Sequence, residues 1–324
     1  MKAIICPEFG PPENLRLETV DDPVAGPGEV VVDVKASAVI YPDTLIIHDR
    51  YQFKAQPPFI PGGEVAGVIS EIGEGVEGFS IGDDVVGGIG TVGGFAEKQA
   101  IPAARVRPLP EGLPHAEATG LGYAYGTGYY GLKFRGDLAE GETLLVTGAS
   151  GSVGLAAIEV GKVMGARVIA AASTDEKLAL CKERGADETI NYSNEDLKNR
   201  AKELTGGNGV DVVYDAVGGD KAEQALRALA WRGRFLVIGF TAGIPKIPLN
   251  LTLLKGCDIR GVFWGASLVR EPDIADQVAR DIDQMAADGK LRPHITKRYS
   301  LEEAPQALRD MMDRKVIGKI VIEP

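Results

Sequence analysis

The sequence predicts an α/β protein with two domains, one rich in antiparallel β-strands and one built on a doubly wound parallel sheet. Short Val- and Ile-rich runs between Gly, Pro and Asp fill the chain up to about residue 110, which is typical of short antiparallel strands. From Glu142 onward, strand-like runs, glycine-rich turns and helical stretches alternate, which indicates parallel strands covered by helices. With 324 residues, 44% of them hydrophobic, the chain can fill two cores.

The predicted elements follow one another along the chain. In the first part, the strand-like runs include VVVDVKA and EVAGVISEIG. In the second part, the strands TLLVTG, RVIAAAS, VDVVYDAVG and RFLVIGF alternate with the helices GLAAIEVGKVMG, KLALCKERG and AEQALRALAWRG. After Gly261 we expect a helix in IADQVARDIDQMAADGKL, a strand, a helix near EEAPQALRDMMDRK and a last strand, KIVIE. These tail elements are expected to return to the first domain.

Charge and composition exclude several classes of function. The net charge is −11 and no Lys/Arg stripe is present, so nucleic acid is a poor partner. No run approaches the roughly 18 uncharged apolar residues of a membrane-spanning helix, and MKAIICPEFG lacks the apolar region of a signal peptide. We therefore expect a cytoplasmic protein. Cys6, Cys181 and Cys257 lie far apart, which indicates neither a disulfide framework nor a thiolate metal site.

The segment LLVTGASGSVG predicts a dinucleotide-binding turn, because a strand enters three glycines spaced three residues apart and a helix follows. Gly148 would permit a positive φ, Gly151 would let the backbone approach a pyrophosphate, and Gly154 would allow close packing. The amides of Ser152 and Val153 would point at the phosphates from the helix N-terminus. An ordinary glycine-rich turn is the alternative, and the agreement of spacing, strands and helix favours binding.

The end of the second predicted strand, RVIAAAS, favours NADPH over NADH. NAD enzymes commonly place a carboxylate there to bind the ribose 2′-hydroxyl, whereas this chain has Ala172 and Ser173. Lys177 follows one helical turn later and could pair with a 2′-phosphate, although it could equally be a solvated surface lysine.

Nine motifs in order resemble the zinc-free quinone oxidoreductase branch of the medium-chain dehydrogenase/reductase superfamily. They are GPGEVVVDVKA, YPDTLIIHDRYQF, PFIPGGEVAGVISEIGEGV, FSIGDDVVG, GGFAE, GTGYYGL, VTGASGSVG, YDAVGG and GKIVIEP. The resemblance spans essentially the whole chain. It implies a GroES-like catalytic domain at residues 1–122, a Rossmann NADPH-binding domain at 123–261, and a segment at 262–324 that completes the catalytic domain.

The same resemblance implies that both zinc sites of the metal-dependent relatives are absent. Those relatives hold a catalytic zinc with a Cys near residue 40 and the His of a G-H-E triplet, where this chain has GGE with Gly63. Their structural zinc loop carries four cysteines, and this chain has no Cys between Cys6 and Cys181. The three histidines are dispersed without metal-ligand spacing, so no metal is expected.

Motif positions imply which residues contact the cofactor. Tyr192 would lie against the 2′-phosphate with Ser173 and Lys177, although it could also be a half-buried strand-end tyrosine. The other positions expected near the cofactor are Thr127, Val217, Phe240, Phe263, Gly265 and Lys319.

The candidates for polarising the hydride acceptor are Asp43 and Tyr51, which match the family pattern. A phenol at Tyr51 is protonated at neutral pH and could donate to a carbonyl oxygen or to an enolate. For Asp43, a turn or capping carboxylate after Pro42 is favoured over proton transfer. The chain departs from the family at Ile40, usually Asn, and at Asp49, usually Gly, which suggests a more apolar pocket.

Three functions remain open from the sequence. An NADPH-dependent quinone reductase is favoured; an enoyl reductase acting on an enone or enoyl thioester is the second, with His48, Arg50 and Lys54 as the only nearby basic cluster for a long substrate. A non-catalytic, crystallin-like NADPH-binding protein is the third. The segment IPLNLTLLKGCDIRGVFW has the look of an edge strand, and the resemblance implies a homodimer paired through it.

Overall fold

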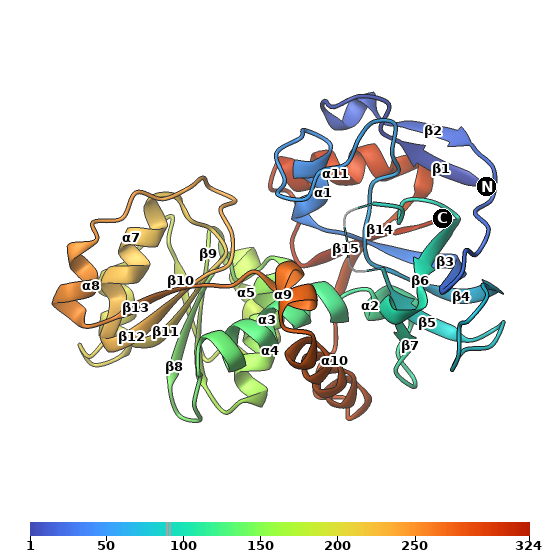
Figure 1. Cartoon of the computed structure of the whole chain (residues 1–324). Coiled ribbons are helices and arrows are strands. Elements are labelled where there is room, and N and C mark those ends of the chain that lie inside the picture. Colours follow the sequence, from blue (N-terminus) through green and yellow to red (C-terminus); the bar gives the residue numbers. More distant parts are fainter. Residues whose placement is uncertain (89, 91) are drawn as a thin grey trace. The chain divides into compact units, whose positions relative to one another are not determined.

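The computed structural model describes residues 1–88, 90 and 92–324. The chain forms two compact units (Figure 1). Unit 1 comprises Met1–Tyr123 and Arg292–Pro324, and unit 2 comprises Ala124–Leu291. Among the described residues, none of the helices combines the length and the apolar character that a bilayer crossing requires.

Unit 1 is built on a seven-stranded, mainly antiparallel sheet with the order β14-β15-β3-β4-β5-β7, in which β6 also pairs with β3. A separate hairpin pairs β1 with β2. The strands are β1 Lys2–Ile5, β2 Arg16–Thr19, β3 Glu29–Val39, β4 Val65–Ile72, β5 Asp84–Gly87, β6 Lys98–Pro102, β7 Val106–Pro108, β14 Ile295–Ser300 and β15 Lys319–Glu323. The helices are α1 Tyr41–Ile46, α2 His115–Ala118 and α11 Ala304–Met312, with short turns η1 Pro12–Asn14, η2 Ala103–Arg105, η3 Leu121–Tyr125 and η5 Leu301–Glu303.

The long strand β3 organises the core of unit 1. Its alternating Val30, Val32 and Val34 are buried in one cluster with residues of β4, β5 and β6. Strands β3 and β4 approach closely at Gly67, where a Cβ would lie 2.0 Å from the carbonyl oxygen of Asp33. The β3–β4 register shifts at this point, so glycine is required there.

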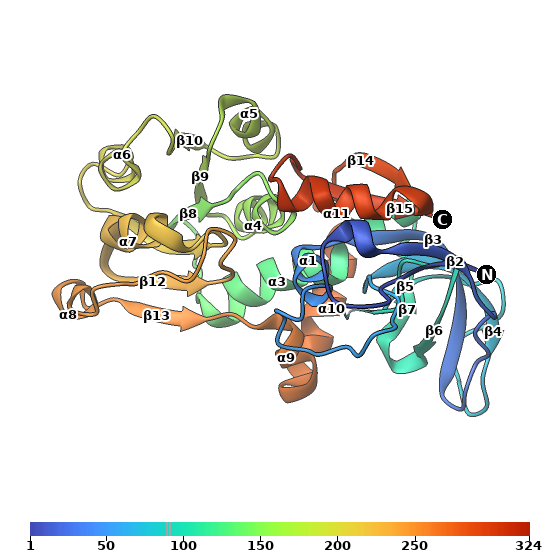
Figure 2. The same cartoon turned by 90° about the horizontal axis from the view of Figure 1, so that it is seen from above.

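Unit 2 contains a six-stranded parallel sheet with the order β10-β9-β8-β11-β12-β13. This is the doubly wound order of dinucleotide-binding domains, in which the order of successive strands along the sheet reverses between β8 and β11. The strands are β8 Thr143–Thr147, β9 Arg167–Ala172, β10 Glu188–Asn191, β11 Val210–Asp215, β12 Leu229–Val237 and β13 Asp258–Gly261. Figure 2 shows α4 and α5 on one side of this sheet and α6 and α7 on the other. The predicted fold class is therefore confirmed.

The helices of unit 2 are α3 Gly126–Tyr129, η4 Tyr130–Arg135, α4 Ser152–Val163, α5 Asp175–Glu183, α6 Leu197–Leu204, α7 Gly219–Ala228, α8 Asn250–Lys255, α9 Trp264–Arg270 and α10 Pro272–Ala287. The segment with edge-strand character is a strand only at β13, which does form an edge of the sheet. Its first half is helix α8, which ends where Gly256 adopts a left-handed φ of 55°.

The tail divides at Arg292, not at residue 262 as the family pattern implies. Residues 262–291 pack within unit 2, where the Tyr129 hydroxyl donates to Asp281 at 3.0 Å and the Tyr130 hydroxyl donates to Glu271 at 2.5 Å. Trp264 stacks obliquely on Tyr130 with ring centres 5.5 Å apart. From Arg292 onward the tail belongs to unit 1, where β14 and β15 join the sheet and α11 is the helix between them.

Candidate active site

The turn after β8 has the backbone geometry that an anion site needs. Gly148 has a φ of 62°, in the left-handed region. A Cβ on Gly154 would lie 2.4 Å from the carbonyl oxygen of Gly148, so this glycine lets α4 start directly against the turn. A Cβ on Gly151 would meet only that same oxygen, at 3.5 Å, which leaves its outer side open. The amides of Ser152 and Val153 begin the 12-residue helix α4, where no intrahelical acceptor exists for them.

Four of the remaining candidates in unit 2 follow the carboxyl ends of strands in the parallel sheet, and such ends lie at one edge of the sheet. Val217 follows β11 and is joined to the loop after β12, since the amide of Ala242 donates to its carbonyl oxygen at 2.8 Å. Phe240 lies in that loop and is 41% exposed. Phe263 and Gly265 follow β13 at the start of α9. The fifth candidate, Thr127, does not follow a strand but is buried on helix α3.

Asp215, which the sequence analysis missed, joins two of these loops. Its buried carboxylate accepts a hydrogen bond from the hydroxyl of Thr147 and from the amides of Val217 and Gly218, at 3.2–3.3 Å. Burial raises the pKa of this carboxyl, and these hydrogen bonds oppose the rise. Asp215 thereby ties the end of β11 to the end of β8. The YDAVGG motif contains this residue and was the available signal.

Polar and cationic side chains cluster at the ends of β9 and β10. The Lys177 ammonium lies 3.4 Å from the Ser173 hydroxyl. The amide of Tyr192 donates to the carbonyl oxygen of Ala172 at 3.1 Å, which brings Tyr192 beside Ser173. Lys221, from the start of α7, donates to the Tyr192 carbonyl oxygen at 3.0 Å and lies 5.4 Å from its ring centre. Lys221 was not predicted, since nothing local in the sequence links α7 to the end of β10.

In unit 1, Asp43 is fully buried and holds the start of α1. Its Oδ2 accepts the amide of Ile40 at 2.8 Å, while Oδ1 is buried without a hydrogen-bond partner among the described residues. Burial raises the pKa of Asp43 to about 8, against the opposing effects of the Ile40 amide and the charge of Lys319. The observed contact is that of a capping carboxylate, in agreement with the favoured structural role.

Tyr51 is half-buried and contacts Phe53 edge-on, with ring centres 5.8 Å apart. Burial raises the pKa of its phenol, the Asp43 charge adds to the rise, and a hydrogen bond with the side chain of Tyr123 opposes it. The phenol of Tyr51 is therefore protonated at neutral pH.

Lys319 lies in unit 1, buried near Glu64 and Asp43. Burial lowers the pKa of Lys319 to about 8, and the two carboxylates oppose this. Burial raises the pKa of Glu64 to about 7, against the charges of Lys319 and Arg107 and hydrogen bonds from Gly122 and Tyr123. Glu64 was not among the predicted site residues, although it stands in the GGE triplet.

Comparisons with known proteins agree with this architecture. Residues 26–111 match the alcohol dehydrogenase GroES-like domain, and residues 152–281 match a family described as zinc-binding dehydrogenase. The chain is 37% identical to quinone oxidoreductase-like protein 2 homolog of Nematostella vectensis, over 99% of this chain and 88% of that protein. The chain belongs to the zinc-free quinone oxidoreductase branch of the medium-chain dehydrogenase/reductase superfamily. It is an oxidoreductase, and the predicted family is confirmed.

Two further relatives of this superfamily bear on the chemistry. The chain is 32% identical to acryloyl-coenzyme A reductase of Sulfurisphaera tokodaii, with full coverage of both chains. The structure of Escherichia coli quinone oxidoreductase complexed with NADPH superposes with a TM-score of 0.90 at 28% identity, again over 100% of both chains.

The described part of the chain offers no ligand set for the zinc that the metal-dependent relatives hold. Gly63 replaces the histidine ligand. Within residues 1–88, 90 and 92–324, no group of three His, Cys, Asp or Glu side chains could hold a metal ion. The described cysteines are free and buried.

The two residues that depart from the family pattern, Ile40 and Asp49, lie just before helix α1 and in the loop that follows it. Asp49 replaces a glycine and has a φ of 54°, a left-handed conformation that Asp tolerates better than most residues. It also pairs with Lys54 at 2.7 Å, which neutralises one cation of the predicted basic cluster. Ile40 is buried, and its amide is held by Asp43.

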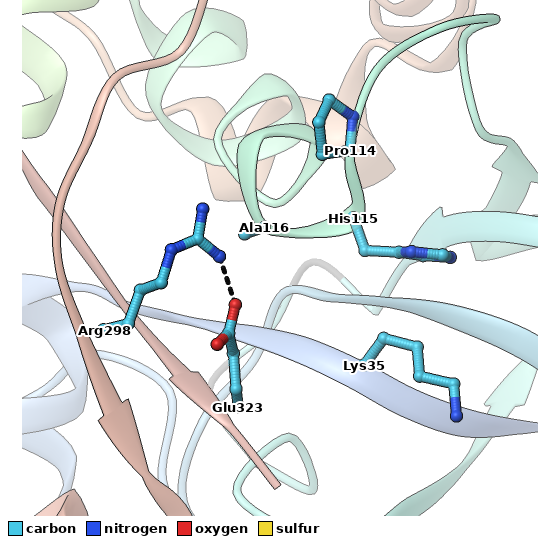
Figure 3. A pocket seen from close by; sticks show the side chains of 6 residues that line it. All are labelled: Lys35, Pro114, His115, Ala116, Arg298 and Glu323. Atoms are coloured by element: carbon cyan, nitrogen blue, oxygen red, sulfur yellow. Dashed lines mark hydrogen bonds and ion pairs between the residues drawn. The ribbon is translucent and has the colours of Figure 1, made fainter.

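A separate hollow of about 330 Å³ lies on unit 1, lined by Lys35, Pro114, His115, Ala116, Arg298 and Glu323 (Figure 3). Arg298 is paired with Glu323 and with Glu117, and His115 bonds to Asp84 at 2.8 Å. None of the predicted site residues lines it.

Proposed function

We propose that the protein transfers a hydride from NADPH to a quinone or a related conjugated carbonyl compound. The cofactor preference rests on the end of β9, where Ala172 and Ser173 stand in place of a ribose-binding carboxylate and the Lys177 ammonium lies 3.4 Å from the Ser173 hydroxyl. The acidic side chain nearest in sequence, Asp175, is engaged with Asn191 at 2.7 Å. The quinone acceptor is supported by the quinone oxidoreductases among the relatives.

The residues present fit NADPH. Gly151 leaves the turn open to a pyrophosphate, which the first amides of α4 would bind. Ser173, Lys177 and Tyr192 would hold the 2′-phosphate, and we assign the rest of the cofactor contacts to Thr127, Val217, Phe240, Phe263, Gly265 and Lys319. Bound NADPH would supply the hydride and both electrons.

Tyr51 is the proposed proton donor to the reduced acceptor. Its raised pKa keeps the phenol protonated, so it can donate this proton at neutral pH. Asp43 is proposed to act by holding the start of α1, not by transferring a proton.

Reduction of an enone or enoyl thioester is the second candidate. A relative with this kind of substrate, acryloyl-coenzyme A reductase, covers the whole chain. After hydride reaches the β-carbon of such a substrate, the α-carbon must receive a proton, which gives Tyr51 a required step that quinone reduction does not impose.

Anaerobic oxidation of NADPH and NADH against 1,4-benzoquinone, 9,10-phenanthrenequinone, an enone and crotonyl-CoA tests both candidates. We expect NADPH turnover with the quinones, and survival of this turnover in Tyr51→Phe. Turnover that is restricted to the enone or crotonyl-CoA and lost in Tyr51→Phe would establish the enoyl reductase instead. NADPH binding without turnover of any acceptor would contradict both.

We further propose that the protein forms a homodimer through the β13 edge. Four apolar side chains are exposed along β12, α8 and β13: Trp231, Leu253, Leu254 and Ile259. An unpaired strand edge beside exposed apolar side chains is a surface that a second copy can cover.

A further inference from the structure

Asn191 lies where two neighbouring parallel strands of unit 2 end. It is the last residue of β10 and is paired in register with Ala172, the last residue of β9. Its side chain is only 8% exposed. Burying an amide without partners costs free energy, so the hydrogen bonds of this side chain show what it does there.

The Asn191 side chain bonds to both turns that follow these strands. Its Nδ2 donates to the carboxylate of Asp175, at the start of α5, at 2.7 Å. Its Oδ1 accepts the amide of Ser193 at 3.1 Å, and the hydroxyl of Ser193 donates to the carbonyl oxygen of Ser173 at 2.9 Å. Asn191 thus joins the turn after β10 to the turn after β9, once directly and once through Ser193.

These two turns carry the three residues assigned to the 2′-phosphate. Ser173 and Lys177 stand two residues before and two residues after Asp175, and Tyr192 directly follows Asn191. Groups that must bind one phosphate together do so best when their relative positions are fixed before it arrives. The bond between Asn191 and Asp175 fixes the first turn to the second.

The charge of Asp175 does not explain its place in this turn. The residue is exposed, and a carboxylate beside a phosphate site opposes binding, because like charges repel. Its hydrogen bond with Asn191 supplies a structural reason, and a bond to an ionised acceptor is among the stronger ones.

We propose that Asn191 is a positioning residue for the 2′-phosphate of NADPH, and that it acts by holding the carboxylate of Asp175. This inference rests on the proposed preference for NADPH. Asn191 acts through the two turns and not by contact with the cofactor. Because NADH lacks the 2′-phosphate, loss of this bond weakens the binding of NADPH and leaves the binding of NADH almost unchanged.

Calorimetric titration with NADPH, NADH and 2′-AMP tests this role in Asn191→Ala and Asp175→Ala. We expect each substitution to raise Kd for NADPH and 2′-AMP about 10-fold and Kd for NADH less than about 2-fold. The double variant should be weaker than either single variant by no more than about 2-fold, because both substitutions remove the same bond. Losses that multiply in the double variant would overturn the proposal.

Asp175→Ala also separates position from charge, because the two effects have opposite signs. If Asp175 acted only as a charge, its removal would tighten NADPH. Glu176→Ala removes the neighbouring exposed carboxylate in the first turn of α5 and leaves the bond between Asn191 and Asp175 in place. This control should bind NADPH at least as tightly as the wild type. Tighter or unchanged binding of NADPH by Asp175→Ala overturns the positioning role.

A second control separates selectivity from stability. Asp187→Ala removes a carboxylate that joins the same two strands at their amino ends, where it accepts the amide of Val168 at 2.7 Å and pairs with Lys162 at 2.8 Å. It should lower the melting temperature and leave the ratio of the Kd values for NADH and NADPH as in the wild type. If Asp187→Ala changed this ratio as much as Asn191→Ala, the proposal would be wrong, because any loosened strand pair would then have the same effect.

The titrations also distinguish failure of this inference from failure of the proposed cofactor. Asp175 is exposed, so Asp175→Ala still gives an answer where the buried substitution Asn191→Ala prevents folding. A wild type that binds NADH as tightly as NADPH would contradict the proposed cofactor, and the role of Asn191 with it. A wild type that prefers NADPH, with the same preference in both variants, would overturn the role of Asn191 alone.

Discussion

Single carboxylates in this chain could be assigned a role from the sequence only where the partner is local. The capping role of Asp43 was readable because Pro42 precedes it and the bonded amide, that of Ile40, lies three residues away. Glu64 and Asp215 bind amides of residues more distant along the chain or tie together separate strands. Their roles depend on the tertiary fold, and no local pattern reveals which amides a buried carboxylate meets.

Asp43→Asn should flatten the pH dependence of stability. The folded pKa of about 8 lies above the unfolded value of about 3.9, so the folded state binds the extra proton between these pH values. The free energy of unfolding therefore falls as pH rises through this window, by at most about 1.4 kcal/mol per pH unit from this group. Asn retains an acceptor for the Ile40 amide and does not titrate. Urea unfolding at pH 5, 6, 7 and 8 checks this.

The matched control for that experiment is Asp83→Asn. Asp83 accepts the amide of Ser80 at 2.7 Å across the same three-residue spacing, but it is exposed. Its replacement should leave the slope of stability against pH as in the wild type. Glu64 also has a raised pKa in this range, so the informative quantity is the difference between variant and wild type. Parallel curves for Asp43→Asn and wild type would contradict the raised pKa of Asp43.

Lys177→Ala and Lys221→Ala should weaken the binding of NADPH more than the binding of NADH. Both ammonium groups lie in the cluster with Ser173 and Tyr192, where a 2′-phosphate would be bound. A charge-assisted hydrogen bond contributes about 1.5–3 kcal/mol, so Lys177→Ala should raise Kd for NADPH at least about 10-fold. Lys221 is already bonded to Tyr192, and we expect a smaller rise. Calorimetric titration with NADPH, NADH and 2′-AMP measures both.

Lys182→Ala provides the comparison, because it removes a lysine at the other end of the same helix, α5, where it bonds to the carbonyl oxygen of Asp187. Its affinities for NADPH and NADH should match the wild type. Equal losses for NADPH and NADH in Lys177→Ala would show that the lysine does not recognise the 2′-phosphate.

At the scale of elements, the sequence predicted those strands and helices whose hydrophobic residues recur with a regular local period. The strand, glycine turn and helix around Gly148 and Gly154 form one continuous signal, and the structure reproduces it. Helix α8 was missed because a short apolar run fits a strand and a helix equally well. The boundary at Arg292 was missed because contacts such as Tyr129 with Asp281 join residues far apart in the sequence.

Substitutions at two glycines of the turn after β8 should have different effects, one on the stability of unit 2 and the other on the binding of NADPH. At Gly154 an added Cβ meets backbone at 2.4–2.7 Å, so Gly154→Ala should destabilise unit 2 by about 1–3 kcal/mol even without cofactor. At Gly151 the space is open, so Gly151→Ala should leave the melting temperature within a degree or two and weaken NADPH binding, because its methyl group would face the pyrophosphate. Thermal melts with and without NADPH distinguish the two, and a stable Gly154→Ala variant would contradict the packing argument.

At the scale of the whole molecule, the exposed apolar side chains near β13 are the reason that we expect a homodimer. Leu253 and Leu254 are 80% and 65% exposed, and Trp231 is 70% exposed while its ring lies against Gly256. We expect light scattering to give twice the 34.3 kDa mass of the chain. The double variant Leu253→Lys/Leu254→Lys should dissociate to monomers, because four lysines would meet across a two-fold axis.

Ile81→Lys is the comparison for this variant, since Ile81 is 69% exposed in unit 1, away from the β13 edge in the sequence and in the sheet order. It adds one lysine at an exposed apolar side chain of unit 1 and should remain dimeric. Far-UV circular dichroism must be unchanged in both variants, because dissociation caused by unfolding would carry no information on the interface. A dimer that persists in the double variant would place the interface elsewhere, and the exposed leucines would then need another reason, such as a different partner surface.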